Sequence, residues 1–177
     1  MITKRLGKRM MEEVVERYSQ YMRLMKSQVL GEGCLSEQDI TTKFVLPFLA
    51  SLNWSIYEVG MKGPEVHEKA FREKSNVGKG LPDIVLKSNN GTVFVEVKKP
   101  PLRSQGTSNL ERYNDSDLIV LTSFNITKLY SRYKVNKPRL RFEFNVEQYV
   151  PEFDAIWHVL SNTDEGKQAR AGYKATR

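Results

Sequence analysis

The sequence predicts an α/β domain, because two long helical patterns come first and short strand-like segments follow. Apolar residues recur at helical spacing over residues 8–30 and again over residues 36–53. After Asn53 the chain changes to short runs of β-branched and aromatic residues separated by turn-forming residues. A chain of 177 residues has the length of one ordinary domain with a single core.

The composition is that of a folded globular protein, with 40% hydrophobic and 28% charged residues. The single cysteine, Cys34, and two well-separated histidines, His67 and His158, exclude a disulfide framework and argue against a zinc site. Any metal would therefore be held by oxygen ligands. Lys and Arg exceed Asp and Glu by 28 to 21, giving a net charge of +7, which favours a polyanionic partner such as nucleic acid.

The amino-terminal segment is charged and amphipathic, unlike a signal peptide. The longest apolar stretch, around residues 44–52, contains Pro47 and is too short to cross a bilayer. We therefore expect a cytoplasmic protein with no membrane partner.

The two helices have recognisable ends. The first, over residues 8–30, is followed by Gly31 and Gly33, which end helices readily. The second begins at Ser36, whose hydroxyl can cap it, and has Glu37 and Asp39 in its electropositive first turn. It ends near residue 53.

The remaining elements are shorter. We expect strands over residues 55–59, 65–70, 81–87, 92–98, 117–121, 128–134 and 139–144, and short helices over 108–115 and 152–160. Residues 161–177 are polar and contain glycine, which indicates a tail or linker. The expected organisation is a helical extension over 1–33, the main domain over 34–160 and a polar tail over 161–177.

The hairpin over residues 81–98 carries the most informative pattern. Side chains alternate between the faces of a strand, so Glu96 and Lys98 share a face while the neighbouring valines point to the core. The turn over residues 88–91 has the sequence Ser-Asn-Asn-Gly, which favours a hairpin. An even-numbered loop sets Asp83 opposite either Lys98 or Glu96, and both registers bring the three side chains to one face. An odd-numbered loop would separate Asp83 from the other two.

Two carboxylates this close repel one another unless a cation lies between them. Mg²⁺ prefers such oxygen ligands together with water, and the backbone carbonyl of Val97 can supply another. Lys98 beside a bound water can orient it, help to deprotonate it, or stabilise charge on a phosphate. The alternative is a cross-strand ion pair between Asp83 and Lys98, with Glu96 on a solvated face. The spacing alone leaves both interpretations open.

Pro82-Asp83 and Glu96-Val97-Lys98 resemble the two halves of the PD-(D/E)xK nuclease motif. The flanking segments are similar to the amino-terminal nuclease domains of type I and type ISP-like restriction enzymes. These segments are residues 36–54, in which Asn53 replaces the usual glycine, and residues 118–130. The resemblance covers about residues 36–134.

The resemblance implies a restriction-endonuclease-like αβββαβ core, with a mixed central sheet flanked by helices and an additional amino-terminal helix. It implies a Mg²⁺-dependent endonuclease, in which Mn²⁺ can substitute, that leaves 3′-hydroxyl and 5′-phosphate ends on double-stranded DNA. Asp83, Glu96 and Lys98 are then the catalytic residues. The metal ligands are Asp83, Glu96, Val97 and Glu37, with Asp39 as the weaker candidate for the position of Glu37.

Restriction subunits of this kind carry a Gln-x-x-x-Tyr motif after the lysine, and this chain has Asn109-Leu-Glu-Arg-Tyr113 there. Asn keeps an amide, and Tyr113 can support the active-site face; Gln105 lies at the wrong spacing. Cations flank the motif on both sides, which suits a phosphate backbone. The candidate DNA-binding residues are Lys79, Lys99, Arg103, Asn109 and Tyr113, and further flanking cations are Lys74 and Arg112.

The resemblance also suggests partners, namely a translocase or helicase motor and a methyltransferase in the same chain or complex. The expected function is cleavage in a restriction-modification or anti-phage enzyme. One alternative is a structure-selective nuclease that resolves junctions or acts in repair. A second is a non-catalytic DNA-binding module on the same fold.

Overall fold

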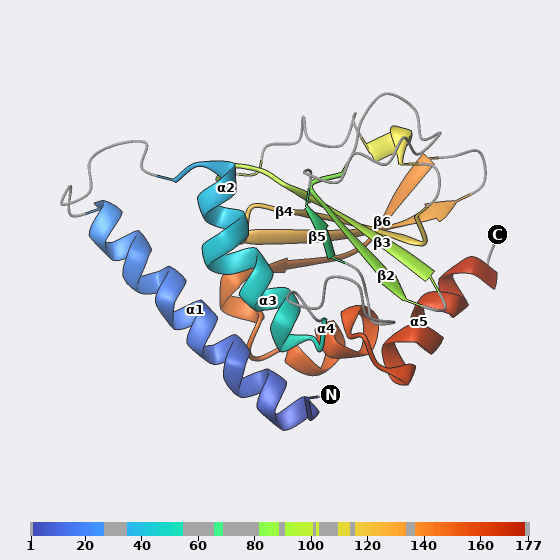
Figure 1. Cartoon of the computed structure of the whole chain (residues 1–177), viewed down its shortest axis with the longest axis horizontal. Coiled ribbons are helices and arrows are strands. Elements are labelled where there is room, and N and C mark those ends of the chain that lie inside the picture. Colours follow the sequence, from blue (N-terminus) through green and yellow to red (C-terminus); the bar gives the residue numbers. More distant parts are fainter. Residues whose placement is uncertain are drawn as a thin grey trace.

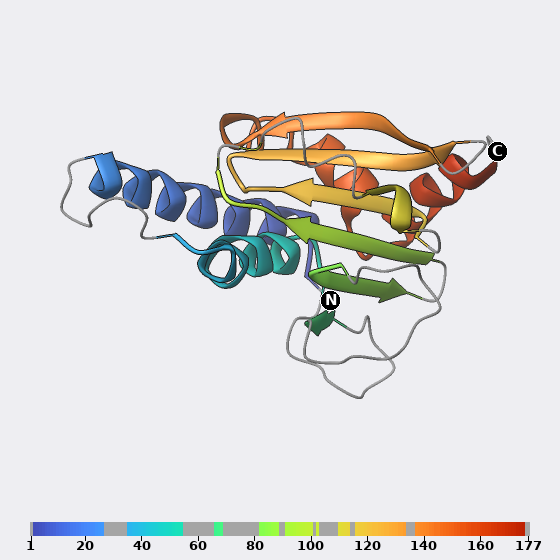
Figure 2. The same ribbon diagram turned by 90° about the horizontal axis from the view of Figure 1, so that it is seen from above.

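The protein has an α/β fold in which helices cover one face of a mixed β-sheet (Figures 1 and 2). The computed structural model describes residues 2–26, 35–54, 66–68, 82–88, 91–100, 102, 110–113, 116–133 and 137–175. Its six strands lie in sequence order across the sheet. They are β1 (Val66–Glu68), β2 (Ile84–Ser88), β3 (Gly91–Val97), β4 (Leu118–Thr122), β5 (Ile126–Tyr133) and β6 (Lys137–Asn145). Only β3 and β4 pair in parallel; the other neighbours are antiparallel.

The first two helical segments match the predicted pattern closely. Helix α1 (Lys4–Lys26) begins earlier than the spacing of apolar residues indicated. The second segment runs through α2 (Glu37–Ile40), a π-helical turn (Thr41–Val45) and α3 (Leu46–Ser51). The backbone N–H of Leu46 reaches back to the carbonyl of Thr41 within this wider turn. The wider turn ends two residues before Pro47, which has no N–H to donate to a helix.

The start of α2 confirms Ser36 as the helix cap. The backbone N–H of Asp39 donates to Ser36 Oγ at 3.0 Å, and the backbone N–H of Ser36 donates to Asp39 Oδ2 at 3.0 Å. This reciprocal arrangement is a capping box, which satisfies two backbone donors at the helix end.

The main core lies between the helices and one face of the sheet (Figure 1). One row of that face passes from Ile84 through Val95 and Val120 to Leu129 across four adjacent strands. Helix α1 packs on the same core, so the expected amino-terminal extension shares its core with the main domain. The buried hydrophobic side chains of α1 are Met11, Val14 and Tyr18.

The opposite face carries a second, smaller apolar cluster. Phe94, Ile119 and Tyr130 form a row across β3, β4 and β5. Leu110 and Tyr113 cover it from the segment between β3 and β4. Within the helix predicted over 108–115, the described residues form a 3-10 helix (Leu110–Arg112).

The carboxyl-terminal segment differs from the prediction, because a helix occupies much of the expected polar linker. Helix α4 (Phe153–Leu160) is followed by α5 (Asp164–Ala175). Arg170 of α5 is 2% exposed, and its Nη1 donates to the carbonyls of Val159 and Ser161 at 2.9 Å. A Cβ on Gly166 would lie 2.2 Å from the carbonyl of Ser161, so this close approach requires glycine. Polar contacts hold α5 in place, and a search for apolar periodicity cannot detect such contacts.

Asn53 ends the second helical segment with a φ of 66°, the left-handed conformation that glycine adopts most easily and Asn tolerates. Its side chain accepts from the backbone N–H of Ile2 at 2.9 Å and donates to the carbonyl of Asn162 at 3.0 Å. Asn53 thus adopts a backbone conformation that suits glycine and also makes two long-range hydrogen bonds.

None of the described helices has the length and apolarity needed to cross a membrane. The strand predicted over residues 55–59 lies outside the described residues.

Candidate active site

The register of the β2–β3 hairpin confirms that Asp83 lies across from Glu96. Ser88 pairs with Gly91 and Ile84 with Val95, so continuing the ladder by one residue sets Asp83 opposite Glu96. This is one of the two even registers predicted from the turn sequence. Asp83 Oδ2 also accepts a hydrogen bond from the backbone N–H of Val97 at 2.8 Å, which holds the carboxylate against the end of β3.

Glu96 is a buried carboxylate with two charge-assisted contacts. Its residue is 6% exposed. Lys98 Nζ lies 2.5 Å from Glu96 Oε1, and the hydroxyl of Tyr113 donates to Glu96 Oε2 at 2.5 Å. The position of Glu96 contradicts the alternative of a solvated carboxylate beside an Asp83–Lys98 pair.

Lys98 also contacts the backbone of β3, because its Nζ donates to the carbonyl of Val97 at 3.1 Å. One ammonium therefore lies against two of the oxygens that the sequence assigned to a metal ion, those of Glu96 and Val97. A carboxylate and a carbonyl that share one cation form a donor set that suits a hard divalent ion.

Tyr113 supports the carboxylate rather than contacting solvent. Its side chain is 0% exposed, and its ring packs edge-on against Phe94 with centroids 5.6 Å apart. The expectation that Tyr113 binds DNA directly is wrong in this structure because the side chain is buried. Its hydroxyl instead contacts the carboxylate of Glu96, on the face where Tyr113 was expected to give support.

The β4–β5 turn positions the backbone of Lys98. The N–H of Lys98 donates to the carbonyl of Thr122 at 2.8 Å. Phe124 follows with a φ of 64° and a side chain that is 1% exposed. The Tyr149 hydroxyl contacts Thr127 Oγ1 at 2.6 Å and donates to the carbonyl of Phe124 at 2.7 Å. Sequence reasoning missed this network, because its members are distant in the chain and none carries a motif.

The two expected acidic residues of α2 do not join the others. Within the described part of the chain, no three His, Cys, Asp or Glu side chains are grouped closely enough to hold a metal ion. The expected cluster of Glu37 with Asp83 and Glu96 is therefore not formed. Asp39 is engaged in the capping box and in an ion pair with Lys43 at 2.9 Å. Lys43 and then Ser36 hold the pKa of Asp39 well below its usual range.

The expected DNA-binding residues are described only in part. Lys99 is exposed and follows Lys98 directly. Lys79, Arg103 and Asn109 lie outside the described residues, as do Lys74 and Gln105.

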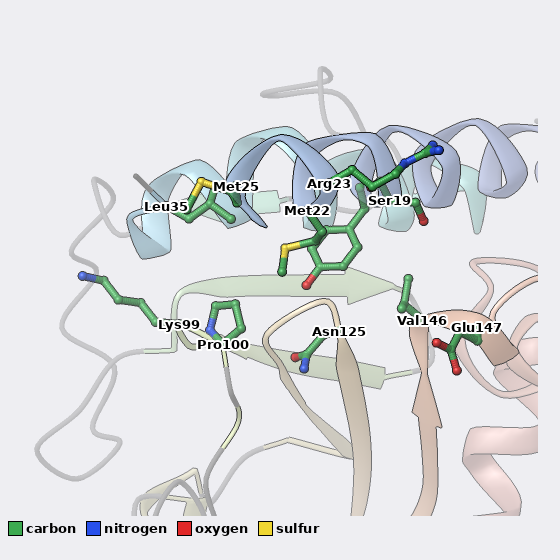
Figure 3. A pocket seen from close by; sticks show the side chains of 11 residues that line it. Ser19, Met22, Arg23, Met25, Leu35, Lys99, Pro100, Asn125, Val146 and Glu147 are labelled. Carbon is green, nitrogen blue, oxygen red and sulfur yellow. The ribbon is translucent and has the colours of Figure 1, made fainter. Parts of the chain in front are cut away.

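A cavity of about 720 Å³ opens beside this end of the sheet (Figure 3). Met22 and Met25 reach it from α1 and Leu35 from the segment before α2. Pro100 and Asn125 lie on the opposite side in Figure 3. The lining also includes Lys99.

Comparison of the chain with protein-family models, with curated proteins and with solved structures found no match.

Proposed function

We propose that the chain is a Mg²⁺-dependent endonuclease that hydrolyses phosphodiester bonds of DNA. The observation that carries this proposal is the grouping at the end of β3. There Asp83 is held opposite a buried Glu96, and Lys98 lies against both Glu96 and the carbonyl of Val97. The net charge of +7 supports a polyanionic substrate.

Asp83, Glu96 and the Val97 carbonyl would hold the metal ion, because their oxygens are the hard ligands that Mg²⁺ prefers. Mg²⁺ bound there supplies Lewis-acid polarisation of the scissile phosphate and acidifies water. Lys98 stabilises negative charge on the phosphate and orients the attacking water. Tyr113 keeps the Glu96 carboxylate in place, since it holds the oxygen that Lys98 does not contact.

The motif resemblance suggests two finer features of this function. The first is a restriction-endonuclease-like core in which Mn²⁺ can replace Mg²⁺. The second is the biological role. That role is double-stranded DNA cleavage in a restriction-modification or anti-phage enzyme, alongside a motor and a methyltransferase. The order of a helix, three strands, a short 3-10 helix and a further parallel strand is compatible with that core.

The test is nicking of supercoiled plasmid with Mg²⁺ and with EDTA. Glu96→Gln and Lys98→Ala should each lower the nicking rate by about a hundredfold or more, as expected when a positioned charge is lost from an active site. Lys128→Ala is the matched control. Lys128 pairs with Glu143 at 3.2 Å on the same sheet face and is similarly half-buried, so its loss should leave nicking unchanged.

A second readout separates catalysis from folding. Removing the Lys98 ammonium frees Glu96 Oε1 and the Val97 carbonyl, so Lys98→Ala should bind Mn²⁺ at least as tightly as the wild type while it loses activity. Glu96→Gln should weaken Mn²⁺ binding. Metal-dependent nicking that survives both substitutions would contradict the site. Wild-type protein that binds DNA but cuts neither duplex nor branched DNA would favour the non-catalytic module.

A further inference from the structure

The cavity beside the candidate active site is lined in part by a tyrosine whose buried hydroxyl is unsatisfied. Tyr18 lines the cavity and is 3% exposed. Among the residues that the structure describes, its hydroxyl has no hydrogen-bond partner. A buried donor without a partner is unfavourable, so a small movement of Tyr18 that brings its hydroxyl to an acceptor atom in the cavity would gain a hydrogen bond.

The rest of the cavity suits a flat apolar group. Met22, Met25 and Leu35 form one wall, and methionine side chains adapt readily to planar partners. Pro100 and Asn125 face them, so an apolar surface and an amide lie on the other side (Figure 3). A volume of about 720 Å³ is within the range of small-ligand sites.

The cationic side chains that line the cavity lie at its rim and not in its interior. Figure 3 shows the guanidinium of Arg23 extending along α1 and the ammonium of Lys99 pointing away from Pro100. Glu147 also borders the cavity, so two cations and one anion surround it. Cations at the rim suit phosphates that pass across the opening while a neutral group enters.

We propose that this cavity receives the base of an unpaired nucleotide in the DNA strand bound at the candidate active site. The inference rests on the proposed function and names its substrate class, which is duplex DNA with an unpaired or flipped-out nucleotide. The connection is direct in the chain, because Lys99 at the cavity follows Lys98 at the active site. A base offers acceptor atoms for Tyr18 and two flat faces for the methionines.

The test measures binding of the full chain in EDTA, so that no cleavage is needed. Two labelled duplexes of the same sequence are compared by fluorescence anisotropy, one fully paired and one with a single unpaired 2-aminopurine. The bulged duplex should bind about tenfold more tightly, as expected for one stacked base. The 2-aminopurine emission should change on binding, because the base moves into the cavity.

Four variants test the location. Tyr18→Phe should reduce the preference for the bulge by about threefold to tenfold through loss of one hydrogen bond. Leu35→Trp should abolish the preference by placing an indole against the methionine wall, where the base would stack. Tyr21→Phe removes a neighbouring hydroxyl of α1 that does not line the cavity, and Leu140→Trp adds an indole at an exposed leucine of β6. Both controls should retain the preference.

Equal affinity for the two duplexes, or a preference that survives both cavity variants, overturns the inference. A parallel titration with deoxyadenosine monophosphate distinguishes the source of the nucleotide. If it binds with the same sensitivity to the cavity variants while the bulge confers no advantage, the cavity serves a free nucleotide and the strand assignment is wrong. Nicking assays in Mg²⁺ are independent of these outcomes, so a failed nuclease with an intact bulge preference refutes only the proposed function.

Discussion

Replacing Tyr113 by phenylalanine removes one hydroxyl from the buried carboxylate of Glu96 and leaves the ring packed against Phe94. The side chain of Glu96 is 8% exposed, so water cannot easily replace the lost donor. A hydrogen bond to a charged group contributes about 1.5–3 kcal/mol. We therefore expect Tyr113→Phe to lower the free energy of unfolding by about 2 kcal/mol.

A double-mutant cycle attributes the loss to the Tyr113–Glu96 contact. In the Glu96→Gln background the acceptor is neutral, so Tyr113→Phe should cost only about 1 kcal/mol. Urea unfolding of the four proteins, followed by circular dichroism, gives the coupling energy. Tyr130→Phe is the control, because it removes a hydroxyl from the same apolar cluster and Tyr130 donates no described hydrogen bond to Glu96.

The same substitution should also slow metal-dependent nicking, by about tenfold if the carboxylate loses 1.4 kcal/mol of positioning in the transition state. A change in unfolding free energy below about 0.5 kcal/mol, with no coupling to Glu96, would refute the reasoning. It would mean that Lys98 alone holds the carboxylate.

Three further predictions concern the two ends of the helical segment over residues 36–53. Ser36→Ala should lower the free energy of unfolding by about 1 kcal/mol through loss of the helix cap, whereas Ser19→Ala on an exposed turn of α1 should have little effect in the same urea titration. Asn53→Ala should destabilise the protein more than Asn53→Gly in thermal unfolding, by about 1 kcal/mol. Both variants lose the side-chain hydrogen bonds, but only alanine is strained at a φ of 66°. The pKa of Asp39 is lowered by Lys43, so its stabilising contribution is present above its ordinary value of 3.8 and is lost as the pH falls through the lower folded-state value. Asp39→Asn should therefore unfold with a weaker pH dependence than the wild type below about pH 4, and an unchanged acid limb would contradict this assignment.

The local part of the site could be predicted from the sequence because strand geometry has a period of two. Alternation placed the core valines on one face of β3 and Glu96 on the other, and the even turn brought Asp83 across from Glu96. Ser36 could be recognised because a helix cap depends on residues that are close in sequence.

The rest of the site depends on contacts that no local pattern encodes. Tyr113 reaches Glu96 only because the chain crosses over between β3 and its parallel neighbour β4. Lys98 was assigned to the chemistry, but its contact with the Val97 carbonyl requires a side-chain conformation that spacing cannot specify. Helix α5 was missed because a buried arginine, rather than an apolar stripe, holds it in place.

The long-range hydrogen bond of Asn53 affects the order in which the chain can complete its packing during synthesis. Asn53 donates to the carbonyl of Asn162, and the indole N–H of Trp54 donates to the carbonyl of Leu160 at 2.8 Å. These partners are separated by 109 and 106 residues. Helices α1 and α3 emerge from the ribosome long before residues 160–162, so their junction stays incomplete until all six described strands have been made. Contacts between residues so far apart in the sequence slow folding. The first helices to be synthesised can complete their packing only after residues 160–162 have been made.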